Sequence, residues 1–88
     1  MLTTTAIQNP VFLAKVRRAM ADAGRRALSM AHPITAATVR NRHGAPVLEV
    51  RFFARPYSGP AAFEFIDAQD NDRTAQVRRA IQTSKGVH

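Results

Sequence analysis

The sequence predicts an α+β two-layer sandwich in which one long helix, a three-stranded antiparallel meander and a second helix follow one another (αβββα). Three patterns indicate this order. Apolar residues recur every three or four positions between residues 10 and 31, alternate with polar ones from residue 34 to 66, and return to helical spacing after residue 72. An apolar helix stripe and the apolar face of a sheet are buried by packing together, which makes two layers.

The first helix is expected to run from Pro10 to about Ala31. Asn9 can accept a backbone N–H as the N-cap, and Pro10 loses no hydrogen bond at the first helical position. Pro33 ends the helix, because the residue before a proline is pushed out of the helical conformation. Gly24 lies at the edge of the apolar stripe, where its small size would allow close packing. The stripe consists of Leu13, Val16, Met20, Ala23, Ala27 and Ala31.

Alternation of apolar and polar residues predicts three short strands. Gly44 supports a hairpin between the first two, and the prolines and Gly59 of residues 55 to 60 support a longer loop before the third. The apolar face of the sheet is expected to carry Thr35, Ala37, Val39, Leu48, Val50, Phe52, Phe63 and Phe65.

The register of the strands follows from keeping the apolar residues on one face. Val39 should then lie opposite Leu48. By the same rule Arg51 lies opposite Glu64 on the other face, where we expect a cross-strand charge pair.

The second helix is predicted to begin at residues 70 to 72, which offer a cap and acidic groups for the first turn, where they complement the helix dipole. Val77, Ala80 and Ile81 give it a narrow apolar stripe, and Gly86 is expected to end it. A chain of this length forms one modest core. We therefore predict a single domain over residues 10–86, a loose lead-in at residues 1–9 and a tail at residues 87–88.

This order of elements resembles that of the double-stranded RNA-binding domain, which also runs helix, three strands, helix. In that domain the phosphate contacts come largely from a lysine-rich start to the second helix. The corresponding stretch here, DNDRTAQVRR, begins with acidic residues. The resemblance is one of topology, and it carries no binding residue over to this chain.

Charge favours a polyanionic partner. The net charge is +7, and 11 of the 13 basic residues are arginine, whose planar guanidinium suits phosphate recognition. Our first hypothesis is a small basic accessory protein that binds DNA or RNA mainly through phosphate contacts. The candidate contacts are Lys15, Arg18, Arg25 and Arg26 on the first helix, Arg40 and Arg42 at the first turn, Arg55 in the second loop, and Arg78 and Arg79 on the second helix. Because meander turns alternate ends, the first turn and the Arg55 loop should not form one compact site.

The alternative is a protein-binding module or inhibitor that docks on an acidic protein surface through the outer sheet face or the basic first helix. Phe53 and Ile66 share the outer sheet face with Arg51, and apolar groups there suggest cover by the second helix, a second subunit or a partner. A homodimer that packs its outer sheet faces together is a third hypothesis.

No pattern typical of a catalytic or metal site is present. The histidines at 32, 43 and 88 lack metal-ligand spacing, and the acids at 67, 70 and 72 lack the glycine and glutamate of an EF-hand. There is no glycine-rich phosphate loop. We expect a non-enzymatic protein without a cofactor. The absence of cysteine, and of any apolar run near the ~20 residues of a membrane span, favours a cytoplasmic location.

Overall fold

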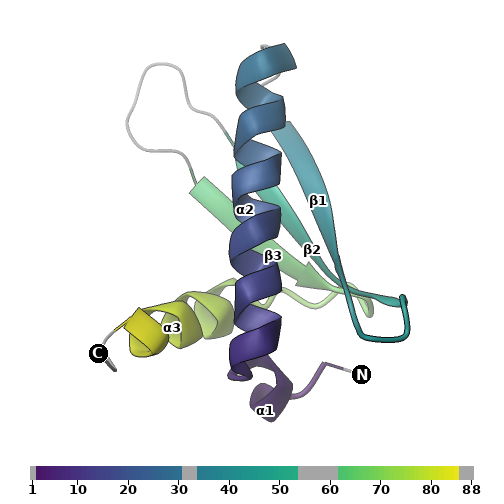
Figure 1. Cartoon of the computed structure of the whole chain (residues 1–88), viewed down its shortest axis with the longest axis vertical. Helices are drawn as coiled ribbons and strands as arrows, with labels where there is room; N and C mark the ends of the chain where they lie inside the picture. Colours follow the sequence, from purple (N-terminus) through teal and green to yellow (C-terminus); the bar gives the residue numbers. More distant parts are fainter. Residues whose placement is uncertain (1, 31–33, 54–61, 86–88) are drawn as a thin grey trace.

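A computed structural model describes residues 2–30, 34–53 and 62–85 of the 88-residue chain. The elements are α1 (Thr4–Ile7), α2 (Pro10–Met30), β1 (Ile34–Arg40), β2 (Pro46–Phe53), β3 (Ala62–Asp67) and α3 (Thr74–Lys85). The strands form one antiparallel sheet in the order β1-β2-β3, and α2 crosses one face of it (Figure 1). The predicted succession of helix, meander and helix is confirmed.

The predicted register is also confirmed. Val39 pairs with Leu48, and Arg51 stands opposite Glu64. A bulge opposite Val39 and Arg40 adds one residue to β2 directly after the turn. Alternation was a sufficient guide here, because a slip of one residue would turn the whole apolar set toward solvent.

Helix α2 begins as the sequence predicts. The Asn9 side-chain oxygen accepts the backbone N–H groups of Val11 at 2.9 Å and Phe12 at 3.2 Å. Gly24 is different from the expectation, since a Cβ built at this position meets no atom within 4 Å. Close packing therefore does not explain this glycine. The buried stripe consists of Leu13, Val16, Ala19, Ala23 and Ala27, with Met20 half-buried; Ala31 lies outside the described residues.

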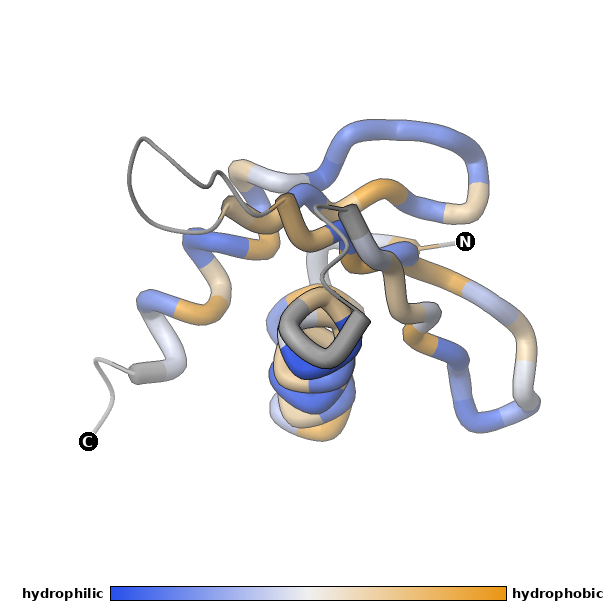
Figure 2. The backbone as a smooth tube through the Cα atoms, turned by 90° about the horizontal axis from the view of Figure 1, so that it is seen from above, coloured by the Kyte–Doolittle hydropathy of each residue, from blue (hydrophilic) through white to orange (hydrophobic). Residues whose placement is uncertain are grey.

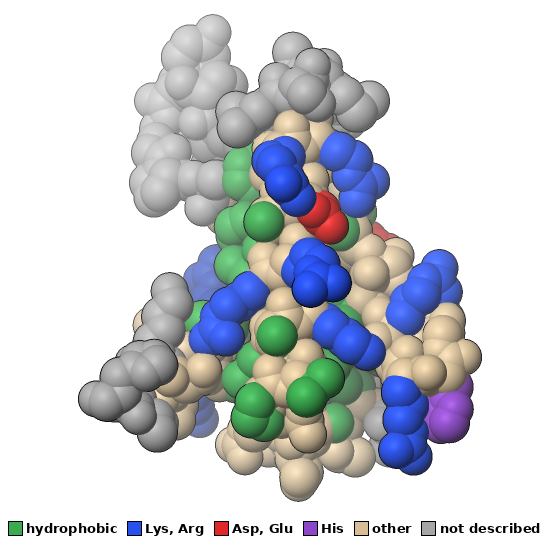
Figure 3. Space-filling model, in the orientation of Figure 1, with side chains coloured by type: hydrophobic (Ala, Val, Ile, Leu, Met, Phe, Trp, Pro, Cys, Tyr) green, Lys and Arg blue, Asp and Glu red, His purple; other side chains and the backbone are tan. Residues whose placement is uncertain are grey.

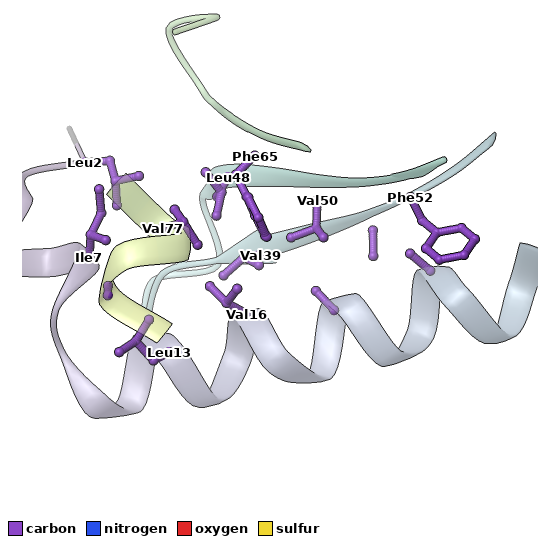
Figure 4. Packing of buried hydrophobic residues seen from close by; sticks show 14 of the residues in the cluster. Leu2, Ile7, Leu13, Val16, Val39, Leu48, Val50, Phe52, Phe65 and Val77 are labelled. Atoms are coloured by element: carbon purple, nitrogen blue, oxygen red, sulfur yellow. The ribbon is translucent and has the colours of Figure 1, made fainter. Parts of the chain in front are cut away.

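The core lies between the sheet and both longer helices. Val16 of α2 and Val77 of α3 are fully buried, and both belong to the cluster that contains Val50 and Phe65 of the sheet (Figure 4). Viewed along α2, that helix lies beneath the strands with α3 to one side (Figure 2). Helix α3 therefore does not cover the outer sheet face. The second helix was one of the three kinds of cover expected there, beside a second subunit and a partner.

The expectation of a loose lead-in was wrong. Residues 4–7 form the helix α1, capped by Thr3, whose hydroxyl accepts the Ala6 N–H at 3.1 Å. Leu2 and Ile7 are 4% and 1% exposed and belong to the core cluster. The two apolar residues of this short segment close the lower end of the core, where α1 contacts both α2 and α3.

The corner between β3 and α3 is built around a buried carboxylate. Asp67 accepts the backbone N–H groups of Gln69 and Asn71, each at 2.9 Å, and the Nε–H of Arg73 at 2.8 Å. The backbone N–H of Asn71 is the largest cause that lowers the pKa of Asp67 to about 2, against the opposing effect of burial, and Arg73 lowers it further.

Helix α3 starts later than predicted, at Thr74, so the acidic residues precede its first turn rather than occupying it. Asp72 caps the helix by accepting the Thr74 N–H at 2.9 Å, and its hydrogen bonds to Thr74 lower the pKa of Asp72. Val77 and Ala80 are buried and Ile81 is half-buried, as predicted; Gly86 lies outside the described part of the chain. No helix among the described residues is long and apolar enough to cross a membrane.

Candidate nucleic-acid interface

The outer face of α2 carries exposed arginines. Arg18 and Arg25 project opposite the buried stripe, and Asp22, the only acid of α2, forms a salt bridge with Arg25. Arg26 is also exposed. Arg18 contacts no acid within the described ranges, so its charge is available to a ligand. Figure 3 shows Lys and Arg side chains along α2 and beside the β1–β2 turn on one face of the molecule.

A hydrogen bond joins the start of α2 to the hairpin. Lys15 donates from Nζ to the carbonyl oxygen of Arg40 at 3.2 Å. The Arg40 side chain bends back along its own turn and donates from Nη1 to the carbonyl oxygen of Gly44 at 3.0 Å. These contacts bring cations from two separate elements to one place.

The turn itself is held by its own sequence. The side-chain oxygen of Asn41 accepts the N–H groups of His43 at 2.9 Å and Ala45 at 3.0 Å, which is how Asn stabilises tight turns. Gly44 has a φ of 84°, in the region that favours glycine. Arg42 and His43 stand at the tip, with Arg42 Nε 3.3 Å from His43 Nε2. Because these hydrogen bonds already order the turn, its backbone loses little conformational entropy when its basic side chains bind a ligand.

Between the turn and the start of α2 lies a depression of about 570 Å³, which we call the basic hollow. Its basic residues are Lys15, Arg40, Arg42 and His43, and none of its lining residues is acidic. Phe12 and Val11 supply an apolar side, and Val11 is 67% exposed. The full lining is Ala6, Asn9, Val11, Phe12, Lys15, Arg40, Asn41, Arg42 and His43. The hollow offers cations for a phosphate next to apolar surface for a sugar or base.

The proximity of the start of α2 to the β1–β2 turn was not predicted from the sequence. The lengths of α2 and β1 nevertheless indicate it. A helix of 21 residues is roughly 31 Å long, and a strand of seven residues that returns along it covers roughly 23 Å. The turn that follows β1 must then lie near the first turns of α2. The prediction about the second loop is not tested, because Arg55 lies outside the described residues.

The cations of α3 lie apart from the basic hollow. Arg78 donates from Nη2 to the carbonyl oxygen of Phe63 at 3.2 Å, at the far edge of the sheet. Arg79 lines a different cavity, of about 560 Å³, between α1, α2 and α3. Arg17, which is not among the predicted contacts, donates to the Ser84 hydroxyl at 2.9 Å and extends the basic face of α2 toward α3.

On the outer sheet face the expected ion pair has a different partner. Arg51 stands opposite Glu64, but its Nε donates to Glu49 Oε1 at 2.6 Å, two residues back along the same strand. The hydrogen bond and charge of Glu49 raise the pKa of Arg51 above its usual value, and Glu64 contributes less. Phe53 and Ile66 are half-buried on this face. The arginine is thus part of a local pair, whose members are 38% and 44% exposed, and not a free anion site.

Among residues 2–30, 34–53 and 62–85, no group of three or more His, Asp or Glu side chains is placed to hold a metal ion. Comparisons of the chain with protein-family models, curated proteins and solved structures find no match.

Proposed function

We propose that this protein is a small non-enzymatic nucleic-acid-binding protein that holds the sugar-phosphate backbone on the face formed by α2 and the β1–β2 turn. The observation that carries the proposal is the basic hollow, where Lys15, Arg40, Arg42 and His43 gather from two elements without an acid. Phosphate contacts supply most of the affinity of non-specific nucleic-acid binding, and arginine provides them in a paired geometry.

The outer arginines of α2 extend the same face. Arg18 lies on the exposed side of the helix whose first turns wall the hollow, and Arg25 lies two turns further on, beside Asp22. A strand of nucleic acid that enters the hollow can continue along α2, where Arg18 and Arg25 offer further cations to its phosphates.

Fluorescence polarisation with labelled duplex DNA, single-stranded DNA and RNA tests the proposal. At about 50 mM salt we expect binding to at least one of the three, weakening with salt by a slope of about −0.9 per phosphate contact on duplex DNA. The double variant R18Q/R42Q should bind more weakly. Its affinity should also depend less steeply on salt, by the amount that corresponds to the loss of about two phosphate contacts.

The control is R51Q, which also removes positive charge but from the outer sheet face, where Arg51 is already paired with Glu49. It should reduce affinity much less than R42Q alone. Absence of binding to all three probes would overturn the proposal, and an equal loss in R51Q and R42Q would place the contacts elsewhere.

A second candidate function is docking on a protein partner through the apolar residues of the outer sheet face. Phe53 and Ile66 support it, because they lie half-buried on the side of the sheet that neither α2 nor α3 covers. Affinity capture with the wild type and with F53S/I66S tests this candidate. A partner retained only by the wild type would favour it, and a partner retained equally by both would exclude this face.

A further inference from the structure

The two edge strands of the sheet, β1 and β3, differ in whether their outward backbone groups have hydrogen-bond partners. Edge β3 is closed by groups from the corner and from α3. The Phe65 N–H donates to the Thr74 hydroxyl at 3.1 Å, and the Phe65 carbonyl accepts the Arg73 N–H at 2.7 Å. The Asp67 N–H donates to the carbonyl of Asn71 at 2.9 Å, and the Phe63 carbonyl accepts Arg78.

These bonds also fix which residues of β1 face outward. Since Phe63, Phe65 and Asp67 turn their backbone groups away from β2, the intervening residues of β3 bond to β2. Alternate residues of β2 then bond to β3 and to β1, and the register shows which residues of β1 take part. Ala37 and Val39 bond to β2, whereas Ala36 and Thr38 turn their N–H and C=O groups outward.

No described residue satisfies the outward groups of Ala36 and Thr38. β1 stands at the open side of the sheet (Figure 1), and among the described residues the outward group of β1 that is engaged is the Arg40 carbonyl at its end, which accepts a hydrogen bond from Lys15. Proteins usually protect a free edge with proline, lysine, a short strand or a covering element. β1 has seven residues, ITAATVR, with neither proline nor lysine, and its only charged side chain is bonded to Gly44.

We propose that β1 is a dimerisation edge, which pairs antiparallel with β1 of a second copy of this chain to form a continuous six-stranded sheet. Two features favour a second copy over another occupant. The segment from Ile34 to Val39 is uncharged, so the net charge of +7 is not concentrated at the contact. The closed β3 edge prevents further addition, so that association stops at a closed dimer rather than a filament.

The register of the dimer follows from symmetry. A two-fold axis perpendicular to the sheet keeps inner residues opposite inner residues, and full overlap of the seven residues places the axis at Ala37. Ala36 of one copy then lies opposite Thr38 of the other, on the outer face, with their outward groups forming the new ladder. The two Arg40 residues lie at opposite ends, roughly 20 Å apart along the strand direction. Both α2 helices lie on the same side of the joined sheet.

A pair of variants that differ at one residue tests both the edge and the register. In A36K/T38K each lysine faces a lysine of the partner, which should dissociate the dimer. In A36E/T38K each glutamate faces a lysine of the partner, and within the chain the new residues stand opposite Arg51 and Glu49 of β2. This second variant should keep the dimer.

Sedimentation velocity over a range of protein concentrations gives the readout, without nucleic acid. The wild type and A36E/T38K should approach twice the 9.7 kDa of one chain, and A36K/T38K should remain at the mass of one chain with an unchanged circular dichroism spectrum. We expect the dissociation constant of A36K/T38K to rise at least about tenfold. Amide exchange should show protection of Ala36 and Thr38 that grows with concentration.

A wild-type protein that stays monomeric at every concentration overturns the proposal. A dimer that persists in A36K/T38K overturns the edge as its interface. Neither result bears on nucleic-acid binding, which the charge-loss variants of α2 and the turn test separately.

Discussion

Arg73 and Asp67 close the corner between the sheet and α3 through a hydrogen-bonded ion pair of 2.8 Å, in which the carboxylate is fully buried and the arginine side chain is 19% exposed. The same guanidinium donates from Nη2 to the carbonyl oxygen of Leu2 at 2.8 Å. One arginine thus connects the end of β3 to the N-terminal segment, which lies 71 residues away in sequence.

We expect D67N to destabilise the protein markedly. The amide would present N–H groups to a site built from donors, and Arg73 would keep its charge without its partner. The midpoint of thermal unfolding should fall by about 10 °C or more. D70N is the matched control, because Asp70 is exposed and has a φ of 67°, a conformation that Asn adopts readily. A D70N protein as unstable as D67N would contradict the role given to the corner.

The Asp67 carboxylate should also make the stability of the folded chain depend on pH. The pKa of Asp67 is lowered from 3.8 to about 2 in the folded chain, so below pH 3.8 the unfolded chain binds the proton more readily. The stabilisation is therefore complete above pH 3.8 and is lost as the pH falls toward 2. In urea titrations over this range, the difference in stability between the wild type and D67N should shrink as acid is added. A constant difference would mean that the charge of Asp67 does not contribute.

Ile7 tests whether α1 belongs to the core. I7A removes a side chain that is 1% exposed and should cost about 2–5 kcal/mol in the free energy of unfolding. V11A, at a site that is 67% exposed, should change it by less than about 0.5 kcal/mol. Urea unfolding at neutral pH measures both, and similar values for the two variants would contradict the placement of α1.

Replacing each of the two described glycines with alanine should change the stability of the protein in opposite directions. G24A adds a Cβ that meets nothing within 4 Å inside a helix, and should stabilise the protein by about 0.5–1 kcal/mol. G44A forces alanine to a φ of 84° and should destabilise it by about 1–2 kcal/mol. Thermal melts of both variants give the comparison, and a loss of stability in G24A would show that the helix needs the glycine.

The sequence was a good guide wherever the spacing of apolar residues decides which face of a helix or strand is buried. The pairing of Val39 with Leu48 and the buried stripe of α2 follow from spacing alone. It failed where distant segments meet. Nothing local indicates that Leu2 would be bonded to Arg73, or that Arg51 would select Glu49 over the cross-strand Glu64. The basic hollow was missed for the same reason, since Lys15 and Arg40 are 25 residues apart.

Asp22 offers a gain-of-affinity test of the nucleic-acid proposal. It is the only acid of α2 and pairs with Arg25, so D22N should release that arginine and remove a repulsive charge from the proposed binding face. We expect affinity for the best of the three probes to rise about two- to fivefold at low salt, with the gain shrinking as salt screens the contact. E64Q is the matched control, because it removes one negative charge from an exposed position on the outer sheet face. Polarisation titrations of the two variants at two salt concentrations separate local from overall charge. If E64Q gains as much as D22N, affinity follows net charge alone, and the face formed by α2 and the turn has no special part in binding.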